Sequence, residues 1–132
     1  MDELCTKDAL ELADLIRKNE TSSKEVVEAH LNRISEINPE LNAITLTLEE
    51  SALEAAEKAD NASDEDHKRP FHGVPFTIKE NIDFKGTPTT QGVPLLAESM
   101  PPRNAPIVDR MMEAGAIPIG RTNLPEMGMR LD

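Results

Sequence analysis

The chain has 132 residues, 25 acidic and 14 basic side chains, and a formal net charge of −11, so its length suits one domain. The acidic balance argues against nucleic-acid binding, which needs a clustered basic surface, and no apolar run approaches the length of a membrane span. The N-terminus lacks the basic and apolar segments of a secretion signal, and the single cysteine, Cys5, cannot form an internal disulfide. These features predict a soluble, cytoplasmic protein.

The two halves of the chain differ in composition. Residues 1–69 hold 18 acidic and eight basic side chains, whereas residues 70–132 hold seven and six. All six glycines lie at or after Gly73, and nine of the ten prolines lie at or after Pro70. We expect an acidic, mainly helical first half and functional residues in the second half, because loops with special backbone geometry often carry function.

The first half predicts two helices in succession. Residues 7–18 carry an apolar stripe, and Ser22 with Glu25 forms a capping box that starts a second helix. Asn38-Pro39 is predicted to end that helix, because proline disfavours helical geometry in the residue before it.

A strand, a helix and a loop are predicted next. Residues 43–48 alternate in the manner of a strand, and residues 50–59 are rich in Ala and Glu, as in a helix. Residues 60–69 are charged and without periodicity, which predicts an exposed, mobile loop.

The second half predicts two short buried strands, over residues 74–78 and 116–119, with a turn over 120–123 after the second. Between the strands, a long segment over residues 83–105 precedes a short helix over residues 106–114 that Gly115 should end. Helices that alternate with apolar strands predict the α/β class.

Lys79 is the strongest single candidate for chemistry. It follows the apolar run Phe76-Thr77-Ile78, which places it at the carboxyl end of a buried strand, where ligands bind in open α/β sheets. A lysine that loses solvent there has a lowered pKa and can act as a general base or nucleophile. From the pattern alone, a side chain that extends into solvent is the favoured alternative, because perturbed lysines are uncommon.

Other candidates are weaker. No Cys or carboxylate stands at a ligand spacing around His72, and we predict no metal site. Cys5 lacks the basic surroundings of a nucleophile. His30 is expected to pack in the core, His67 to be solvated and His72 to lie where it could line a site. No acid–base pair is evident among the carboxylates near these segments, which are Glu80, Asp83, Asp109 and Glu126.

Four blocks of the chain together carry a family resemblance. His72 to Asp83 resembles the lysine segment of the amidase signature enzymes, and Gly86-Thr87-Pro88-Thr89-Thr90 follows at that family's distance. Residues 104–116 resemble its next helix, and residues 117–126 the strand and turn after that helix. The resemblance covers essentially the whole chain.

The resemblance implies the N-terminal part of an α/β/α sandwich with a mixed central sheet. It also implies amide hydrolysis or amide transfer by a Ser–cis-Ser–Lys triad, with no cofactor. Lys79 matches the family lysine, which is the base at the start of the proton relay, so the resemblance reverses the preference for a solvated lysine. Met129 falls where the family places residues that line the acyl pocket. Arg121 stands for a lysine common in the family and Glu80 for an aspartate, and both changes are conservative.

The chain departs from the family in one respect. The two triad serines belong to a Gly-Ser-Ser-Gly segment further along the family's chains, and none of the six serines here has that setting. We therefore expect residues 1–132 to form a single partial domain that is inactive alone. A partial sheet should expose strand edges and self-associate or bind a complementary chain.

Three functions stay open from the sequence. The chain can be part of an amidase that acts on a small-molecule amide, a subunit of a tRNA-dependent amidotransferase, or a non-catalytic fragment. The stretch Leu124–Arg130 looks more like an amidase than like the amidotransferase subunit.

Overall fold

The computed structural model describes residues 2–129 and confirms the α/β class. The strands are β1 (Ile44–Thr47), β2 (Pro75–Lys79) and β3 (Ile117–Thr122). The α-helices are α1 (Ala9–Arg17), α2 (Ser23–Leu41), α3 (Glu49–Asp60) and α4 (Pro106–Glu113). None of the helices in the described part of the chain combines the length and apolar character that a membrane crossing requires.

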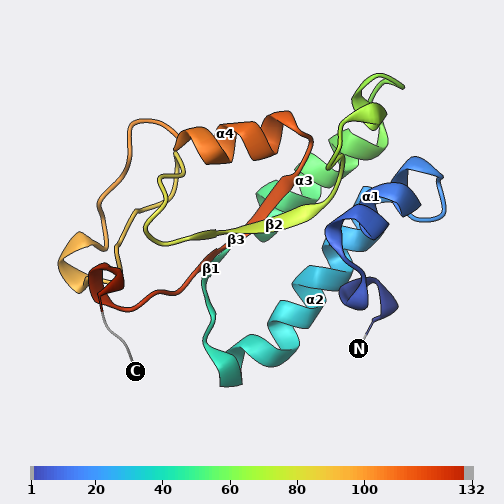
Figure 1. The fold of residues 1–132 in the computed structure, drawn as a ribbon. Helices are drawn as coiled ribbons and strands as arrows, with labels where there is room; N and C mark the ends of the chain where they lie inside the picture. Colours follow the sequence, from blue (N-terminus) through green and yellow to red (C-terminus); the bar gives the residue numbers. More distant parts are fainter. Residues whose placement is uncertain (1, 130–132) are drawn as a thin grey trace.

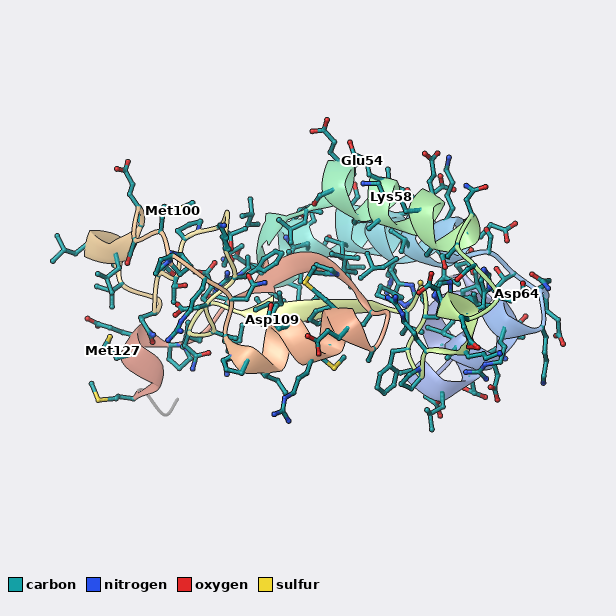
Figure 2. The ribbon with its side chains drawn as sticks, turned by 90° about the horizontal axis from the view of Figure 1, so that it is seen from above. Glu54, Lys58, Asp64, Met100, Asp109 and Met127 are labelled. Atoms are coloured by element: carbon teal, nitrogen blue, oxygen red, sulfur yellow. The ribbon has the colours of Figure 1, made fainter. Side chains whose placement is uncertain are left out.

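The strands form a mixed sheet in the order β1-β3-β2, with β3 antiparallel to β1 and parallel to β2 (Figure 1). Figure 2 shows helices on both sides of the sheet: α3, marked by Glu54 and Lys58, lies on one side, and α4, marked by Asp109, lies on the other. The main core lies between α2, α3 and β3. Its buried residues are Val27, Leu31, Ala52, Ala56, Ile117 and Ile119.

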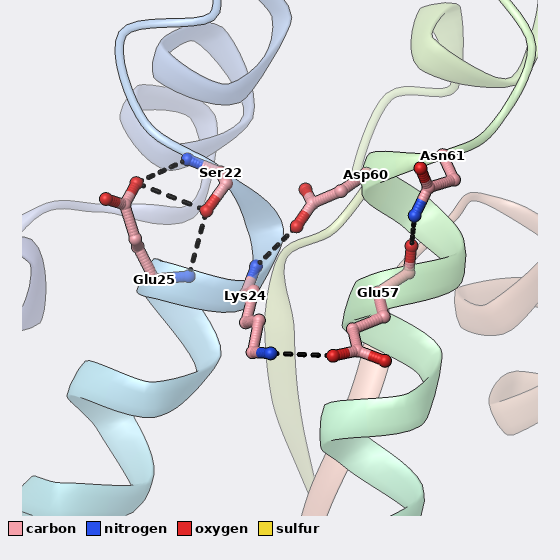
Figure 3. Close-up of polar contacts among 6 residues, drawn as sticks. All are labelled: Ser22, Lys24, Glu25, Glu57, Asp60 and Asn61. Atoms are coloured by element: carbon pink, nitrogen blue, oxygen red, sulfur yellow. Dashed lines mark hydrogen bonds and ion pairs between the residues drawn. The ribbon is translucent and has the colours of Figure 1, made fainter.

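The predicted capping box at the start of α2 is confirmed. The Ser22 hydroxyl accepts from the Glu25 amide at 3.1 Å, and the Glu25 carboxylate accepts from the Ser22 amide at 2.9 Å (Figure 3). Asp60, at the end of α3, accepts from the Lys24 amide at 3.1 Å, and the Lys24 ammonium pairs with Glu57 at 2.6 Å. These bonds satisfy free amides of the first turn and join α2 to α3.

The prediction that Asn38-Pro39 ends α2 was wrong, because the helix includes Pro39 and continues to Leu41. Proline removes one backbone bond and its ring crowds the carbonyl four residues before it, but here both costs fall in the last turn of a 19-residue helix. The helix ends instead at Asn42, whose φ of 54° is left-handed. The Asn38 side chain then bonds both backbone groups of Ile44 and so directs the chain into β1.

The predicted turn over residues 120–123 was also wrong, because β3 continues to Thr122 and pairs with both neighbouring strands there. Gly120 allows this pairing. A Cβ atom at this position would lie 3.1 Å from the Ile44 Cγ2 atom and 3.1 Å from the Leu46 carbonyl oxygen. The missing side chain therefore lets β1 approach β3 closely.

The long segments of the second half are held by backbone bonds. In residues 83–105, the Thr89 amide donates to the Ser99 carbonyl and the Ala105 amide to the Asp83 carbonyl, each at 2.8 Å.

Residues 60–69, predicted as a loop, contain one 3-10 turn over Asp66–Lys68. Gly115, with a φ of 94°, follows α4 as predicted.

His72 is buried behind α3 rather than open to a site. Its Nε2 atom lies 3.0 Å from the Ala59 carbonyl oxygen, and its ring lies 4.4 Å from that of the half-buried His67. A Cβ atom on Gly115 would lie 2.7 Å from the His72 Cα, so the absence of a side chain there makes room for His72. His30 is half-buried, and its Nδ1 atom lies 2.8 Å from the Val26 carbonyl oxygen.

We predict that His72 makes stability depend on pH. Burial lowers the pKa of His72, so the unfolded chain takes up this proton before the folded one does as the pH falls. The contribution of the neutral His72 to the free energy of unfolding is present above about pH 6.5, and it is lost as the pH falls through the folded-state pKa. The free energy of unfolding from urea titrations at several pH values should fall less steeply between about pH 7 and pH 5 in His72→Gln. Equal slopes in wild type and His72→Gln would contradict the prediction.

Candidate active site

Lys79 is the last residue of β2, at the strand end where its sequence position predicts it. Ile78 is buried and Lys79 is exposed, as the alternation of side chains along a strand requires. β2 and β3 are parallel and Lys79 pairs with Thr122, so the carboxyl ends of both strands lie at the same edge of the sheet.

The chain turns sharply after Lys79. The Ile82 amide donates to the Lys79 carbonyl at 2.9 Å, which closes the turn. The Glu80 amide donates to the Thr122 carbonyl at 3.0 Å, and the Glu80 carbonyl accepts from the Gln91 amide at 3.2 Å. The backbone around Lys79 is therefore bonded both to β3 and to the following long segment.

The Glu80 side chain lies inside the protein, with 5% of its surface exposed. One carboxylate oxygen accepts from the Thr45 hydroxyl of β1, and the other accepts from the Thr90 hydroxyl of the long segment. Glu80 thus joins three parts of the chain. Because both of its oxygens are engaged, its geometry suits the support of the site better than an acid or base role.

Arg121 of β3 is fully buried on the other side of the same turn. Its Nη1 atom donates to the Thr87 hydroxyl at 2.5 Å, and its Nη2 atom donates to the carbonyl oxygens of Lys79 at 3.2 Å and Ile82 at 2.8 Å. Burial lowers the pKa of the guanidinium, and the negative charges of Glu80 and Asp83 oppose that shift.

A hollow of about 500 Å³ lies beside Glu80, between the end of β1 and the long segment. Apolar residues form much of its wall, and Thr90 and Asn123 are among the polar residues that line it. A largely apolar hollow with few polar groups is typical of small-molecule sites. Its apolar side chains belong to Leu46, Pro88, Val93, Pro94 and Ala97.

Met129, the other residue assigned to the site, lies after β3 and is 79% exposed. Its contact with a substrate stays a prediction. The nearby Met127 amide donates to the Gln91 carbonyl at 2.8 Å, which ties this segment to the long one.

The remaining candidates lie elsewhere or are otherwise engaged. Asp109 accepts from the Asn104 side chain at 2.7 Å on the exposed side of α4, and Glu126 is exposed. The Cys5 thiol donates to the Ala29 carbonyl at 3.4 Å. Burial raises the pKa of this thiol, which is opposite to the shift that activates a cysteine nucleophile.

The sequence reasoning missed how Arg121 and Glu80 are used. One signal was available in the sequence, since Arg121 follows the apolar Ile117 and Ile119 at a spacing of two residues. A charged residue at the next inward position of a strand indicates a buried polar contact. Reading residues 120–123 as a turn concealed this alternation.

Comparison with known proteins identifies the family. Residues 25–132 match the model of the family described as Amidase. The chain belongs to the amidase signature family. Glu80 and Arg121 both occupy buried positions in this chain.

Curated relatives include enzymes of two kinds. The chain is 44% identical to an indoleacetamide hydrolase of Bradyrhizobium diazoefficiens. The match extends over 123 residues, which are 92% of this chain and 24% of that protein. It is 39% identical over 115 residues to a glutamyl-tRNA(Gln) amidotransferase subunit of Dehalococcoides mccartyi, with 87% and 24% covered. The chain spans about a quarter of the length of these curated relatives.

Solved structures share the fold. The peptide amidase from Stenotrophomonas maltophilia aligns with a TM-score of 0.84 and 30% identity over 94% of this chain and 26% of its own. The 6-aminohexanoate cyclic dimer hydrolase complexed with substrate aligns with a TM-score of 0.80 and 33% identity over 96% and 25%. The mixed α/β architecture expected from the resemblance is therefore confirmed.

We predict that the Thr90 hydroxyl stabilises the segment after Lys79. Thr90→Val keeps the shape of the side chain and leaves one Glu80 oxygen without its donor, which should lower the free energy of unfolding by about 1–3 kcal/mol. Thr90→Ser keeps the hydroxyl, so its free energy of unfolding should fall much less. Urea unfolding of the three proteins measures both values, and an equal loss in the two variants would contradict the assignment of the effect to the hydroxyl.

Proposed function

We propose that this chain is the N-terminal portion of an amidase that hydrolyses a carboxylic amide to an acid and ammonia or an amine. The observation that carries the proposal is Lys79, which the structure presents, exposed, at the carboxyl end of β2. Membership of the amidase signature family and 44% identity to an indoleacetamide hydrolase support it.

In the proposed mechanism, Lys79 is the base of a Ser–cis-Ser–Lys triad. Its amine takes a proton from the bridging serine as that serine takes the proton of the nucleophilic serine. The nucleophilic oxygen then forms a bond to the amide carbon, and backbone amides stabilise the oxyanion. The carbon–nitrogen bond breaks, the proton passes to the leaving nitrogen, and water releases the acid from the acyl-enzyme. Both serines would come from polypeptide other than residues 1–132, and Met129 is proposed to contact the acyl group.

Two other functions remain as alternatives. Identity of 39% to an amidotransferase subunit favours a protein that acts on tRNA-linked substrate with partner proteins. A non-catalytic fragment would keep Lys79 without use. The reading frame around this sequence separates the cases: serines in the same frame indicate one enzyme, serines in a neighbouring frame indicate a split enzyme, and their absence from both favours the non-catalytic alternative.

We also propose that the chain associates with itself or with a complementary chain in the cytoplasm, and that it does not bind nucleic acid directly. Among the described residues, β1 and β2 are each paired on one side only. Large apolar side chains are also exposed: Met100 and Met127 lie at one end of the molecule (Figure 2), and Leu95 is 92% exposed. Unpaired strand edges and exposed apolar groups favour association.

We predict that the isolated 132-residue chain does not hydrolyse amides. Ammonia release from indoleacetamide or another simple amide should not exceed that of buffer. In a protein that joins this chain to the two serines, Lys79→Ala should lower kcat by about a thousandfold or more, because a broken triad has no working relay.

Lys85→Ala is the matched control, because Lys85 is an exposed lysine just after the turn, and this variant should keep the activity. Turnover by the isolated chain that Lys79→Ala abolishes would contradict the predicted inactivity. Undiminished turnover in the complete protein with Lys79→Ala would contradict the proposed function.

We predict association by the isolated chain at micromolar to millimolar concentration. Sedimentation equilibrium should show a mass above that of the 14.5 kDa monomer and rising with concentration. Because the proposed contact is apolar, high salt should not dissociate the oligomer. A monomer mass over the whole range, in the absence of any added chain, would contradict self-association.

A further inference from the structure

Arg121 is a buried charge that bonds to backbone rather than to a carboxylate. Among the described residues, no ion pair includes its guanidinium, and two of its three bonds go to the carbonyl oxygens of Lys79 and Ile82. Burial of a charge is costly unless hydrogen bonds compensate it. The compensation here comes from the turn that carries Lys79, so the shape of that turn and the burial of Arg121 depend on each other.

We infer that Arg121 is a positioning residue for Lys79, which it holds in place through the backbone of the turn Lys79–Ile82. The inference rests on the proposed function, in which Lys79 is the base. Arg121 does not touch the Lys79 ammonium; it bonds the carbonyl oxygen of the same residue, at 3.2 Å.

The geometry of the guanidinium suits this task. Its planar fork presents several donors in a fixed arrangement, and here it spans acceptors from both ends of the turn and the Thr87 hydroxyl beyond it. The Lys79 carbonyl also accepts from the Ile82 amide, so Arg121 reinforces the bond that closes the turn.

Glu80 holds the same turn from its other side. Its amide donates to the Thr122 carbonyl of β3, and its carboxylate accepts from Thr45 and Thr90. The residue after Lys79 is thus bonded to β1, to β3 and to the long segment. With Arg121 on the carbonyl of Lys79 itself, the direction of the lysine side chain from the backbone is set by bonds on both sides.

The test uses the full 132-residue chain and needs no hydrolysis. Residue-resolved hydrogen exchange and the Cα and Cβ chemical shifts of Lys79 are compared in wild type, Arg121→Gln, Arg121→Lys and the control Arg33→Gln, whose side chain pairs with Glu36 on α2. In Arg121→Gln, the Ile82 amide should exchange about tenfold faster or more, because a charge-assisted bond to its acceptor is lost. The Lys79 shifts should move toward coil values, while the Ala56 and Ile119 amides of the core change less than about twofold.

Arg121→Lys should restore most of the protection of the Ile82 amide, because an ammonium also donates to carbonyl oxygens, and Arg33→Gln should match wild type. Uniform acceleration that includes the core amides would assign Arg121 a general structural role and overturn the inference. An unchanged exchange rate of the Ile82 amide in a folded Arg121→Gln variant would overturn the inference as well.

If Arg121→Gln does not fold, Thr87→Val decides the matter, because it removes one acceptor and leaves the guanidinium in place. The Thr87 hydroxyl also donates to the Phe84 carbonyl, so the amides of residues 84–87 do not decide the matter. Faster exchange of the Ile82 amide with unchanged core amides supports the inference, and an unchanged rate at Ile82 overturns it. Failure of the proposed function is a separate result. It would be seen if the complete enzyme still hydrolysed amides after Lys79→Ala.

Discussion

The two-sided pairing of β3 is the constraint on which the rest of the structure depends. β3 pairs with β1 on one edge and with β2 on the other, and its buried Ile117 and Ile119 pack against α2 and α3. Gly120 permits the close approach of β1, and Arg121 follows immediately as the buried donor to the turn after β2. One short strand therefore holds the apolar core at its beginning and the candidate site at its end.

The site combines an exposed lysine with buried polar support. Lys79 extends from the sheet edge, whereas the side chains of Glu80 and Arg121 on either side of its backbone are buried and bonded. This arrangement separates two tasks. The buried bonds set the position of the backbone, and the exposed amine stays available to whatever polypeptide or substrate covers it.

The comparisons place this arrangement within a larger fold. The chain aligns over nearly its whole length with amidase signature structures while covering only about a quarter of theirs. Its part of the fold has its own helical core and its own polar network around the lysine. The strand edges and exposed apolar side chains of the same part explain why we expect it to bind further polypeptide.

Local sequence signals predicted most of the elements and the position of Lys79. The capping box of Ser22 and Glu25, the left-handed Gly115 and the apolar run before Lys79 all act between residues within a few positions of one another. For the same reason they are readable without a structure. The ends of α2 and β3 were misjudged where a local signal, Pro39 or Gly120, was outweighed by the surrounding packing and pairing.

The sequence by itself therefore determined the class of fold, the family resemblance and the placement of the lysine at a strand end. Only the tertiary structure decided which side chains support that lysine. Arg121 and Thr87 are 34 residues apart, and Glu80 and Thr45 are 35 apart, so their bonds exist only once the strands have assembled. The physical reason is that burial of a charge depends on acceptors and donors brought from distant segments, and no local pattern encodes that meeting.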